Sequence, residues 1–130
     1  MSHERPSILV VDDDPGVRRL VVDVLETEGY AVRAVEDGFA ALRSVQNERP
    51  DCIVLDVMLP GMDGHDVLAL LRSHELEEHL PVVMLTAAAD DEHAWRAWSE
   101  GVDYFLAKPF APDELLRFLH YLFTATAQPA

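Results

Sequence analysis

The chain has 130 residues, about the size of one ordinary domain, and its 49% hydrophobic and 26% charged residues are typical of a folded protein rather than a disordered one. Its 24 acidic and 10 basic side chains give a net charge of −14, which disfavours the attraction to phosphates that direct nucleic-acid binding needs. No apolar stretch approaches the roughly 20 residues that span a bilayer, and residues 1–6 do not form a signal peptide. We therefore expect one cytoplasmic domain over residues 1–130, with its core at about 7–123 and with neither a nucleic acid nor a membrane as a direct partner.

Short apolar runs alternate along the chain with segments of helical period. The run at 7–12 is almost continuously apolar, as in parallel strands that are covered on both faces. Asp14 and Pro15 follow as a helix cap and a proline suited to the first helical position, ahead of apolar residues at helical spacing up to Gly29. The alternation repeats, with further strands predicted at 31–35, 52–56, 81–86 and 104–107. Further helices are predicted from Asp37-Gly38 to Pro50, from Asp63-Gly64, from Asp90-Asp91 through Glu100, and from Pro112 to Leu122.

Five strands that alternate with five helices predict an α/β fold. Right-handed crossovers would give a parallel sheet with helices on both faces. Periodicity does not determine the strand order, but the flavodoxin-like order 2-1-3-4-5 suits a doubly wound chain of this length. That order places the first and third strands side by side, so Asp12, Asp13 and Asp56 would be neighbours.

Four predicted strands are followed by polar residues that can bind phosphate or a hard cation. These residues are Asp12-Asp13, Asp56, Thr86 and Lys108. The carboxyl ends of parallel strands share one edge of the sheet, where α/β folds bind ligands. Three carboxylates there would repel one another without a cation, and Mg²⁺ accepts carboxylate oxygens, waters and substrate phosphate as ligands. The set predicts Mg²⁺-dependent phosphoryl transfer with one aspartate as the acceptor.

Each of these residues also has an ordinary structural explanation. Residues 12–14 could simply solvate a turn between a strand and a helix, and Asp14 is assigned to capping in either case. Asp56 and Thr86 could close their strands, and most lysines, like Lys108, are solvated. The prediction therefore depends on their joint position at one edge of the sheet.

Four ordered motifs resemble those of a known family. From about Ile8 to Leu122 the chain is similar to the receiver domain of two-component response regulators, in particular to the free-standing chemotaxis type. The motifs are Ile8 to Asp14, Leu55 to Gly64, Pro81 to Ala87, and Gly101 to Phe110 with the segment Ala107-Lys108-Pro109-Phe110.

The resemblance implies a role for each candidate residue. Asp56 would accept a phosphoryl group from the phosphohistidine of a sensor histidine kinase or of a histidine phosphotransfer protein. Asp13, Asp56 and the main-chain carbonyl of Met58 would hold Mg²⁺, with Asp12 acting through a bound water. Lys108 and Thr86 would each contact a phosphoryl oxygen. The Lys108-Pro109 peptide bond would be cis, a geometry found in only about 5–6% of bonds before proline.

Phosphorylation adds enough charge to shift a nearby two-state element. By the resemblance, Thr86 moves toward the phosphoryl group and an aromatic residue turns inward. This switches a face on the fourth helix, fifth strand and fifth helix that binds a downstream protein target. The aromatic residue is Phe105 here, where most relatives have tyrosine. We therefore expect its rotamer preference, or its recognition by a partner, to be altered.

Trp95 and Trp98 share one face of the fourth predicted helix. Two tryptophans at this spacing can be core residues. Alternatively, Ala94, Ala97 and Gly101 form the buried side and leave Trp95 outward, where tryptophan serves as a binding anchor. A surface for a partner protein or for a weak homodimer is therefore one hypothesis for this helix.

Two positions argue against one dimer arrangement of the family. Receivers attached to winged-helix DNA-binding domains usually have an acidic residue at the position of Tyr104 and an arginine at that of Phe118, and both serve in dimer contacts. Because this chain has aromatic residues there, we do not expect that dimer. Only residues 124–130 follow the last predicted helix, so we expect output through a separate protein.

Two other classes of function fit the sequence less well than a signalling switch. The alternative is a Mg²⁺-dependent phosphohydrolase with an aspartyl-phosphate intermediate, but the second aspartate of such enzymes would stand at Met58, which cannot transfer protons. No glycine-rich nucleotide-binding motif follows the first strand. We expect no enzyme activity beyond the chain's own phosphorylation and slow dephosphorylation. Met58 and Ala88 cannot orient an attacking water, so the phosphorylated form should be long-lived.

Overall fold

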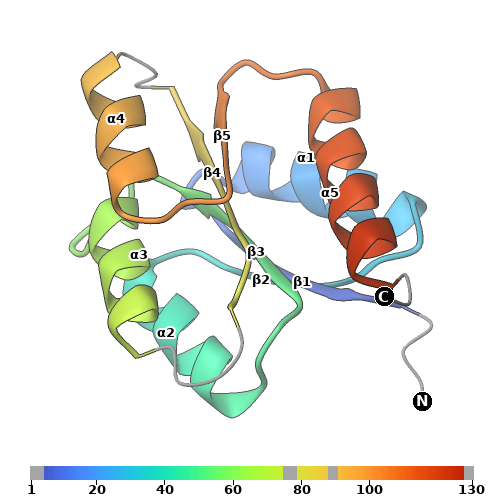
Figure 1. Ribbon diagram of the computed structural model, residues 1–130, viewed down its shortest axis with the longest axis horizontal. Coiled ribbons are helices and arrows are strands. Elements are labelled where there is room, and N and C mark those ends of the chain that lie inside the picture. The colour runs from blue at the N-terminus through green and yellow to red at the C-terminus, as the bar shows by residue number, and fades with distance from the viewer. Residues whose placement is uncertain (1–4, 75–78, 88–90, 128–130) are drawn as a thin grey trace.

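The alternating strands and helices form a parallel sheet that is covered by helices on both faces (Figure 1). The computed structural model describes residues 5–74, 79–87 and 91–127. Within these residues, five strands lie in the order β2-β1-β3-β4-β5, so the predicted fold class and strand order are confirmed. The elements are β1 (Ser7–Val11), α1 (Pro15–Thr27), β2 (Ala31–Val35), α2 (Gly38–Asn47), β3 (Cys52–Asp56), α3 (Gly64–Ser73), β4 (Val82–Thr86), α4 (Asp91–Ser99), β5 (Tyr104–Ala107) and α5 (Pro112–Ala127).

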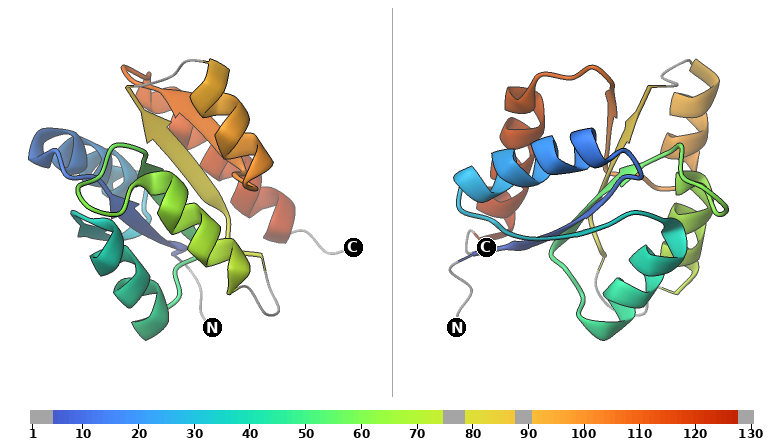
Figure 2. Two further views of the ribbon diagram at one scale, coloured as in Figure 1. Left: turned by 90° about the vertical axis from the view of Figure 1, so that its left-hand side faces the viewer. Right: turned by 180° about the vertical axis from the view of Figure 1, so that it is seen from behind.

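Helices lie on both faces of the sheet (Figure 2), and an apolar layer holds them against each face. Successive side chains of a strand point to opposite faces, so each strand contributes to both layers. One layer joins the sheet to α2, α3 and α4 and includes Leu9, Val11, Ile53, Leu55, Met84, Val67, Leu68 and Ala97. The other joins it to α1 and α5 and includes Ile8, Val10, Val54, Val83, Leu85, Val21, Leu25, Leu115 and Leu119. Burial on both faces explains why the central strands are almost continuously apolar.

Aspartates cap three of the helices at the edge of the sheet where the strands end. The side chain of Asp14 accepts hydrogen bonds from the backbone of α1, and that of Asp37 does so from α2. Asp63 and Asp66 form a reciprocal capping box at the start of α3. Each cap satisfies backbone N–H groups that have no partner within the helix. The assignment of Asp14 to capping is thus confirmed.

The element boundaries differ from the predicted ones by at most five residues, and the largest difference is at the end of α5. β1 ends at Val11, β4 begins at Val82, α4 ends at Ser99 and α5 continues to Ala127. Pro81 lies outside β4 because it has no backbone N–H to donate, although its carbonyl still accepts from Ile53. The proposed cap residue Asp90 and the residue Ala88 lie outside the described residues. No helix in the described part of the chain has the length and apolarity needed to cross a membrane.

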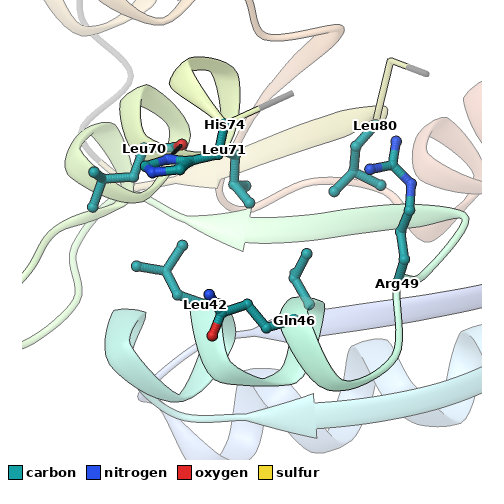
Figure 3. A pocket seen from close by; sticks show the side chains of 8 residues that line it. Leu42, Gln46, Arg49, Leu70, Leu71, His74 and Leu80 are labelled. Carbon is teal, nitrogen blue, oxygen red and sulfur yellow. Dashed lines mark hydrogen bonds between the residues drawn. The ribbon is translucent and has the colours of Figure 1, made fainter. Parts of the chain in front are cut away.

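A groove separates α2 from α3 near their C-terminal ends (Figure 3). The two helices approach closely near their N-termini, where a Cβ on Gly38 would lie 2.8 Å from the Val67 side chain. They diverge beyond this point and leave a volume of about 320 Å³. It is lined by Leu42, Val45, Gln46, Arg49, Leu70, Leu71, His74 and Leu80. None of these lining residues is a carboxylate, and the groove lies at the other end of the helices from the acidic residues described next.

Candidate functional site

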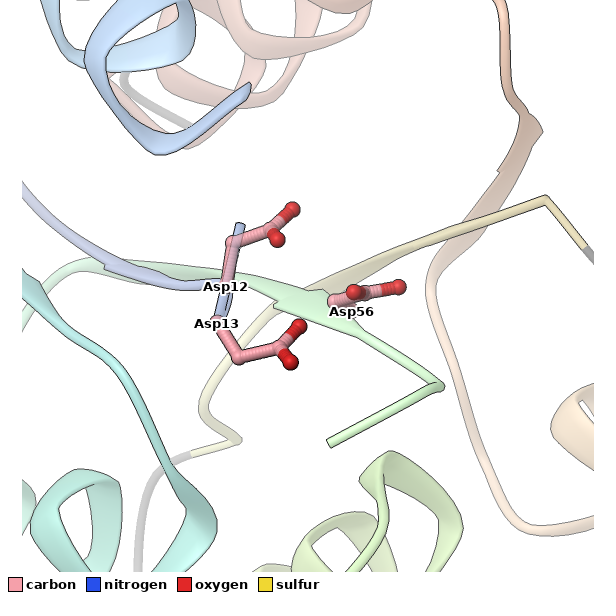
Figure 4. A group of neighbouring side chains, drawn as sticks. All are labelled: Asp12, Asp13 and Asp56. Atoms are coloured by element: carbon pink, nitrogen blue, oxygen red, sulfur yellow. The ribbon is translucent and has the colours of Figure 1, made fainter. Parts of the chain in front are cut away.

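Three aspartates meet at the edge of the sheet where β1 and β3 end (Figure 4). Asp12 and Asp13 directly follow β1, and Asp56 is the last residue of β3, the strand that pairs with β1. One carboxylate oxygen from each lies within 4.8 Å of the others. Asp12 and Asp56 are only 2% and 4% exposed, whereas Asp13 is exposed. The predicted clustering of these side chains is therefore present, and two of the three carboxylates are withdrawn from water.

Lys108 reaches the cluster from the end of β5. Its Nζ lies 3.0 Å from Asp12 Oδ2 and 3.4 Å from Asp56 Oδ2. Its backbone N–H donates to the carbonyl of Thr86 at 2.8 Å, which ties the lysine to the end of β4. The Lys108-Pro109 bond is cis, as the resemblance implies. The cluster thus combines three carboxylates with one ammonium group.

Burial shifts the proton affinities in this cluster. Desolvation, followed by the charge of Asp12, raises the pKa of Asp56 to about 6, although Lys108 and the backbone N–H of Met58 act in the opposite direction. Burial alone would lower the pKa of Lys108, but its hydrogen bond to Asp12 and the nearby carboxylates outweigh that effect and raise it. Lys108 is therefore a cation at neutral pH, while Asp56 has a pKa of about 6. Perturbed groups of this kind are common at functional sites.

The remaining predicted residues lie on neighbouring elements. Thr86 is fully buried at the end of β4. Phe105 of β5 is half-buried and packs in the apolar layer beneath α2, α3 and α4. The backbone N–H of Met58 lies 3.4 Å from Asp56 Oδ1, and the Met58 side chain is 58% exposed. The structure therefore places Met58 beside Asp56, Thr86 at the end of β4 and Phe105 in the apolar layer, while the proposed contacts of Thr86, Phe105 and the Met58 carbonyl stay predictions.

Two residues near the cluster were not among the site residues predicted from the sequence. Gly64 packs against the end of β3 so closely that a Cβ there would lie 2.4 Å from the Asp56 carbonyl oxygen and 2.8 Å from Val57 Cα. The sequence pattern marks Gly64 only as part of a helix start. Arg18 of α1 donates from a guanidinium nitrogen to the carbonyl of Asp12 at 2.8 Å. Its position one helical turn after Pro15 was the available signal, but its partner depends on how α1 packs.

The chemistry of the donor set fits a hard divalent cation. Carboxylate oxygens gathered within 4.8 Å are the ligands that Mg²⁺ prefers, and Asp13 is open to solvent for the waters that this ion retains. A cation there would offset the repulsion between the carboxylates, which Lys108 offsets only in part. The arrangement can therefore hold a metal and present one carboxylate to a phosphoryl group.

Comparisons with known proteins agree with this geometry. Residues 8–120 match the family model described as a response regulator receiver domain. The DNA-binding response regulator MtrA of Mycolicibacterium smegmatis is 42% identical over 116 residues, which are 89% of this chain and 50% of that protein. The response regulator MprA of a Mycobacterium species is 42% identical over 120 residues, which are 92% and 51% of the two chains.

Solved structures have the same fold. The receiver domain of the Francisella response regulator 1452 superposes with a TM-score of 0.87 at 32% identity, covering 94% of this chain and 99% of that one. Vibrio cholerae chemotaxis protein CheY4 superposes with a TM-score of 0.82 at 33% identity, covering 89% and 97%.

The curated relatives bear on two expectations about partners. The chain spans about half the length of those it matches, and MtrA is described as DNA-binding. The expectation that there is no direct nucleic-acid partner is therefore not borne out. The net charge of −14 describes only this chain, which corresponds to about half of a relative such as MtrA. Output through a separate protein stays a prediction for the same reason.

Proposed function

We propose that Asp56 is the phosphoryl acceptor of this chain, which belongs to the response regulator receiver family of two-component signalling. The observation that carries the proposal is a buried carboxylate at the end of β3 that lies 3.4 Å from Lys108 and within 4.8 Å of two further carboxylates. The family supplies the donor, which is a phosphohistidine on a sensor histidine kinase or on a histidine phosphotransfer protein.

The contacts of the three aspartates favour Asp56 as the acceptor. Asp12 is engaged by Lys108 at 3.0 Å and by the backbone N–H of Asp14 at 3.0 Å. The contacts that Asp56 makes with described residues are longer, at 3.4 Å to both Lys108 Nζ and the Met58 N–H, so its carboxylate is held less tightly than that of Asp12. In the transfer, a carboxylate oxygen of Asp56 forms a bond to phosphorus while the N–P bond of the phosphohistidine breaks. The electron pair of that bond returns to the departing imidazole nitrogen.

The residues around Asp56 would bind and orient the phosphoryl group. Lys108 would pair with one of its oxygens and Thr86 would donate to another. Asp13, Asp56 and the main-chain carbonyl of Met58 would hold Mg²⁺, with Asp12 contributing through a water. When bound, the ion would offset the carboxylate repulsion and neutralise charge on the transferred group. Asp56 itself, with a pKa of about 6, is mostly ionised and nucleophilic above pH 7.

Exposed aromatic residues support an output surface formed by α4, β5 and α5. Trp95, Trp98 and Tyr121 are 74%, 51% and 70% exposed, and aromatic residues are the usual anchors of protein interfaces. Where winged-helix receivers carry an acidic residue and an arginine, Tyr104 and Phe118 stack instead, with ring centroids 4.6 Å apart and planes 3° from parallel. We propose that this surface binds a downstream protein target, with a weak homodimer as the alternative occupant.

The switch between states would use Thr86 and Phe105. Strand alternation puts Met84, Thr86 and Phe105 on the face of the sheet that α4 covers, since Phe105 pairs in register with Met84. A phosphoryl group on Asp56 would draw the Thr86 hydroxyl toward it. Phe105 would then fill the space behind, and this rearrangement would reach α4. A phenylalanine can make this movement without a hydroxyl to mark either state.

The test is phosphorylation by acetyl phosphate with Mg²⁺, followed by intact-protein mass spectrometry. Wild type should gain one phosphoryl group, Asp56→Asn should gain none, and Asp23→Asn should behave as wild type because Asp23 is an exposed residue of α1. Labelling of Asp56→Asn to the wild-type level would refute the assignment.

The same preparation separates the switch from the phosphohydrolase alternative. We propose that the chain processes no separate substrate and only hydrolyses its own acyl phosphate slowly, because the exposed apolar Met58 stands where a hydrolase has its acid/base aspartate. Multiple turnovers of an added phosphate ester, abolished by Asp56→Asn, would favour the hydrolase. Decay of labelled wild type within seconds would contradict the expected long-lived form.

A further inference from the structure

A buried histidine outside the acidic cluster joins α3 to the end of α4. His65, the second residue of α3, is 1% exposed, and its Nδ1 lies 2.8 Å from Glu100 Oε1, just beyond the end of α4. An ionised carboxylate can only accept hydrogen bonds, so Nδ1 carries the proton and donates. Glu100 is held from its other oxygen by Arg96 at 3.3 Å.

A second contact from α3 holds the same end of α4. The guanidinium of Arg72 donates twice to the carbonyl of Gly101, at 3.0 and 2.8 Å. Gly101 has a φ of +91°, and the backbone N–H groups of Gly101 and Val102 bond back to the carbonyls of Trp98 and Ala97 at 3.1 Å each. This is the Schellman arrangement that ends a helix with a left-handed residue. The C-terminal end of α4 is therefore closed by its own backbone and attached to α3.

Few of the side chains of α4 that the structure describes are buried. Among the side chains of α4 that the structure describes, Ala97 is buried, whereas Glu92, Trp95, Arg96, Trp98 and Ser99 are exposed. The side chains of Asp91, His93 and Ala94 are not among those described. One buried alanine contributes far less apolar area than the leucines and valines that anchor the other helices. Among the described residues, the contacts at the end of α4 therefore form a large part of its attachment to the fold.

The other end of this connection is the turn that carries Asp56. Gly64, the residue before His65, donates from its backbone to the Val57 carbonyl at 2.8 Å and packs directly on the Asp56 carbonyl. His65 therefore belongs to the first turn of a helix whose start is pressed against the backbone of β3. Asp56 and Glu100 are connected through the first turn of α3 and one partly buried hydrogen bond.

We propose that His65 and Glu100 form a clasp that fixes the C-terminal end of α4 to the first turn of α3, so that α4 responds to Asp56 by pivoting about Glu100. The pivoting response rests on the proposed function, whereas the clasp itself does not. His65 is thus a positioning residue, which acts on the output helix through Glu100 and touches no reacting atom.

The first experiment measures hydrogen exchange in the unphosphorylated protein. In His65→Leu and in Glu100→Ala, the amides of residues 100–102 should exchange roughly tenfold faster, because each change removes the hydrogen bond that joins α3 to Glu100. Glu100→Gln should stay within about twofold of wild type, since its amide oxygen still accepts from Nδ1. His120→Leu, the same substitution at an exposed site on α5, should have no effect. Wild-type exchange in both His65→Leu and Glu100→Ala would overturn the clasp.

If His65→Leu fails to fold, Glu100→Ala alone tests the clasp, because the Glu100 side chain is 24% exposed and its removal leaves no large cavity.

The second experiment uses the two tryptophans of the chain, both of which lie on α4 and report on it directly. Acetyl phosphate and Mg²⁺ should change their fluorescence in wild type. At equal phosphoryl content by mass spectrometry, the change should fall to less than about half in Glu100→Ala and return in Glu100→Gln.

The outcomes separate the two proposals. A full fluorescence change in Glu100→Ala would overturn the pivot, because a helix with a released end could not turn about it. If neither the wild-type protein nor any variant gains a phosphoryl group, the proposed function is wrong, and so is the pivoting response that rests on it. The exchange rates still decide whether the clasp exists.

Discussion

Asp56→Asn is predicted to make the metal-free protein more stable near neutral pH. Asp56 is 4% exposed and its pKa is raised to about 6 from an ordinary value of 3.8, mainly because burial penalises the charged form. A shift of one pKa unit corresponds to a change of about 1.4 kcal/mol in the free energy of the charged form relative to the neutral form. The shift of roughly two units therefore means that ionised Asp56 costs the folded state about 3 kcal/mol. An asparagine has similar size and does not carry the charge.

The sign of the pH dependence follows from which state binds the proton more tightly. Folded Asp56 keeps its proton up to about pH 6, whereas the unfolded chain loses it near pH 4. The contribution of Asp56 to the unfolding free energy therefore falls as pH rises from about 4 to about 6 and stays low above that. Asp56→Asn removes this contribution. The two proteins should differ little at pH 4 and by about 3 kcal/mol at pH 7.5.

Urea unfolding followed by circular dichroism, at several pH values and with a chelator present, measures this difference. Asp23→Asn is the matched control, because the Asp23 side chain is 61% exposed and should leave the stability nearly unchanged. Adding Mg²⁺ should then stabilise wild type more than Asp56→Asn, because a ligand that binds only the folded state adds to its stability by mass action. Equal stabilities at pH 7.5, or a difference that does not vary with pH, would refute the electrostatic reasoning.

Three other substitutions test the geometry of the site. Lys108→Met should raise the pKa of Asp56 further, because the ammonium 3.4 Å away lowers that pKa, and it should slow phosphorylation by at least about tenfold. An NMR titration of the Asp56 carboxyl carbon measures the pKa, and an unchanged value would contradict the prediction. Gly64→Ala should cost roughly 1–3 kcal/mol in urea unfolding and weaken Mg²⁺ binding, since its Cβ meets backbone; wild-type stability would show that the turn can relax. Asp63→Ala should lose the capping box of α3 and about 1 kcal/mol, again in urea unfolding, and no loss would mean that water replaces the cap.

Local sequence determined the elements and the composition of the site. The apolar run before Asp12 and the one before Asp56 are strands because a strand buried on both faces needs apolar residues at every position. Asp14 and Pro15 begin α1 where they were expected, since a cap and a first-turn proline act on the residues next to them. Strand ends could be located in this way, and so could the polar residues that follow them.

Only the tertiary structure decided which of these residues meet. Lys108 and Asp12 are 96 positions apart, and their 3.0 Å contact depends on the pairing and register of β1, β3, β4 and β5. The close approach of Gly64 to β3 and the burial of His65 against Glu100 depend on how α3 packs against the sheet and α4. Periodicity is a property of neighbouring residues, whereas these contacts arise from the joint packing of distant segments. For that reason the sequence alone identified the acidic site but not the connection from it to α4.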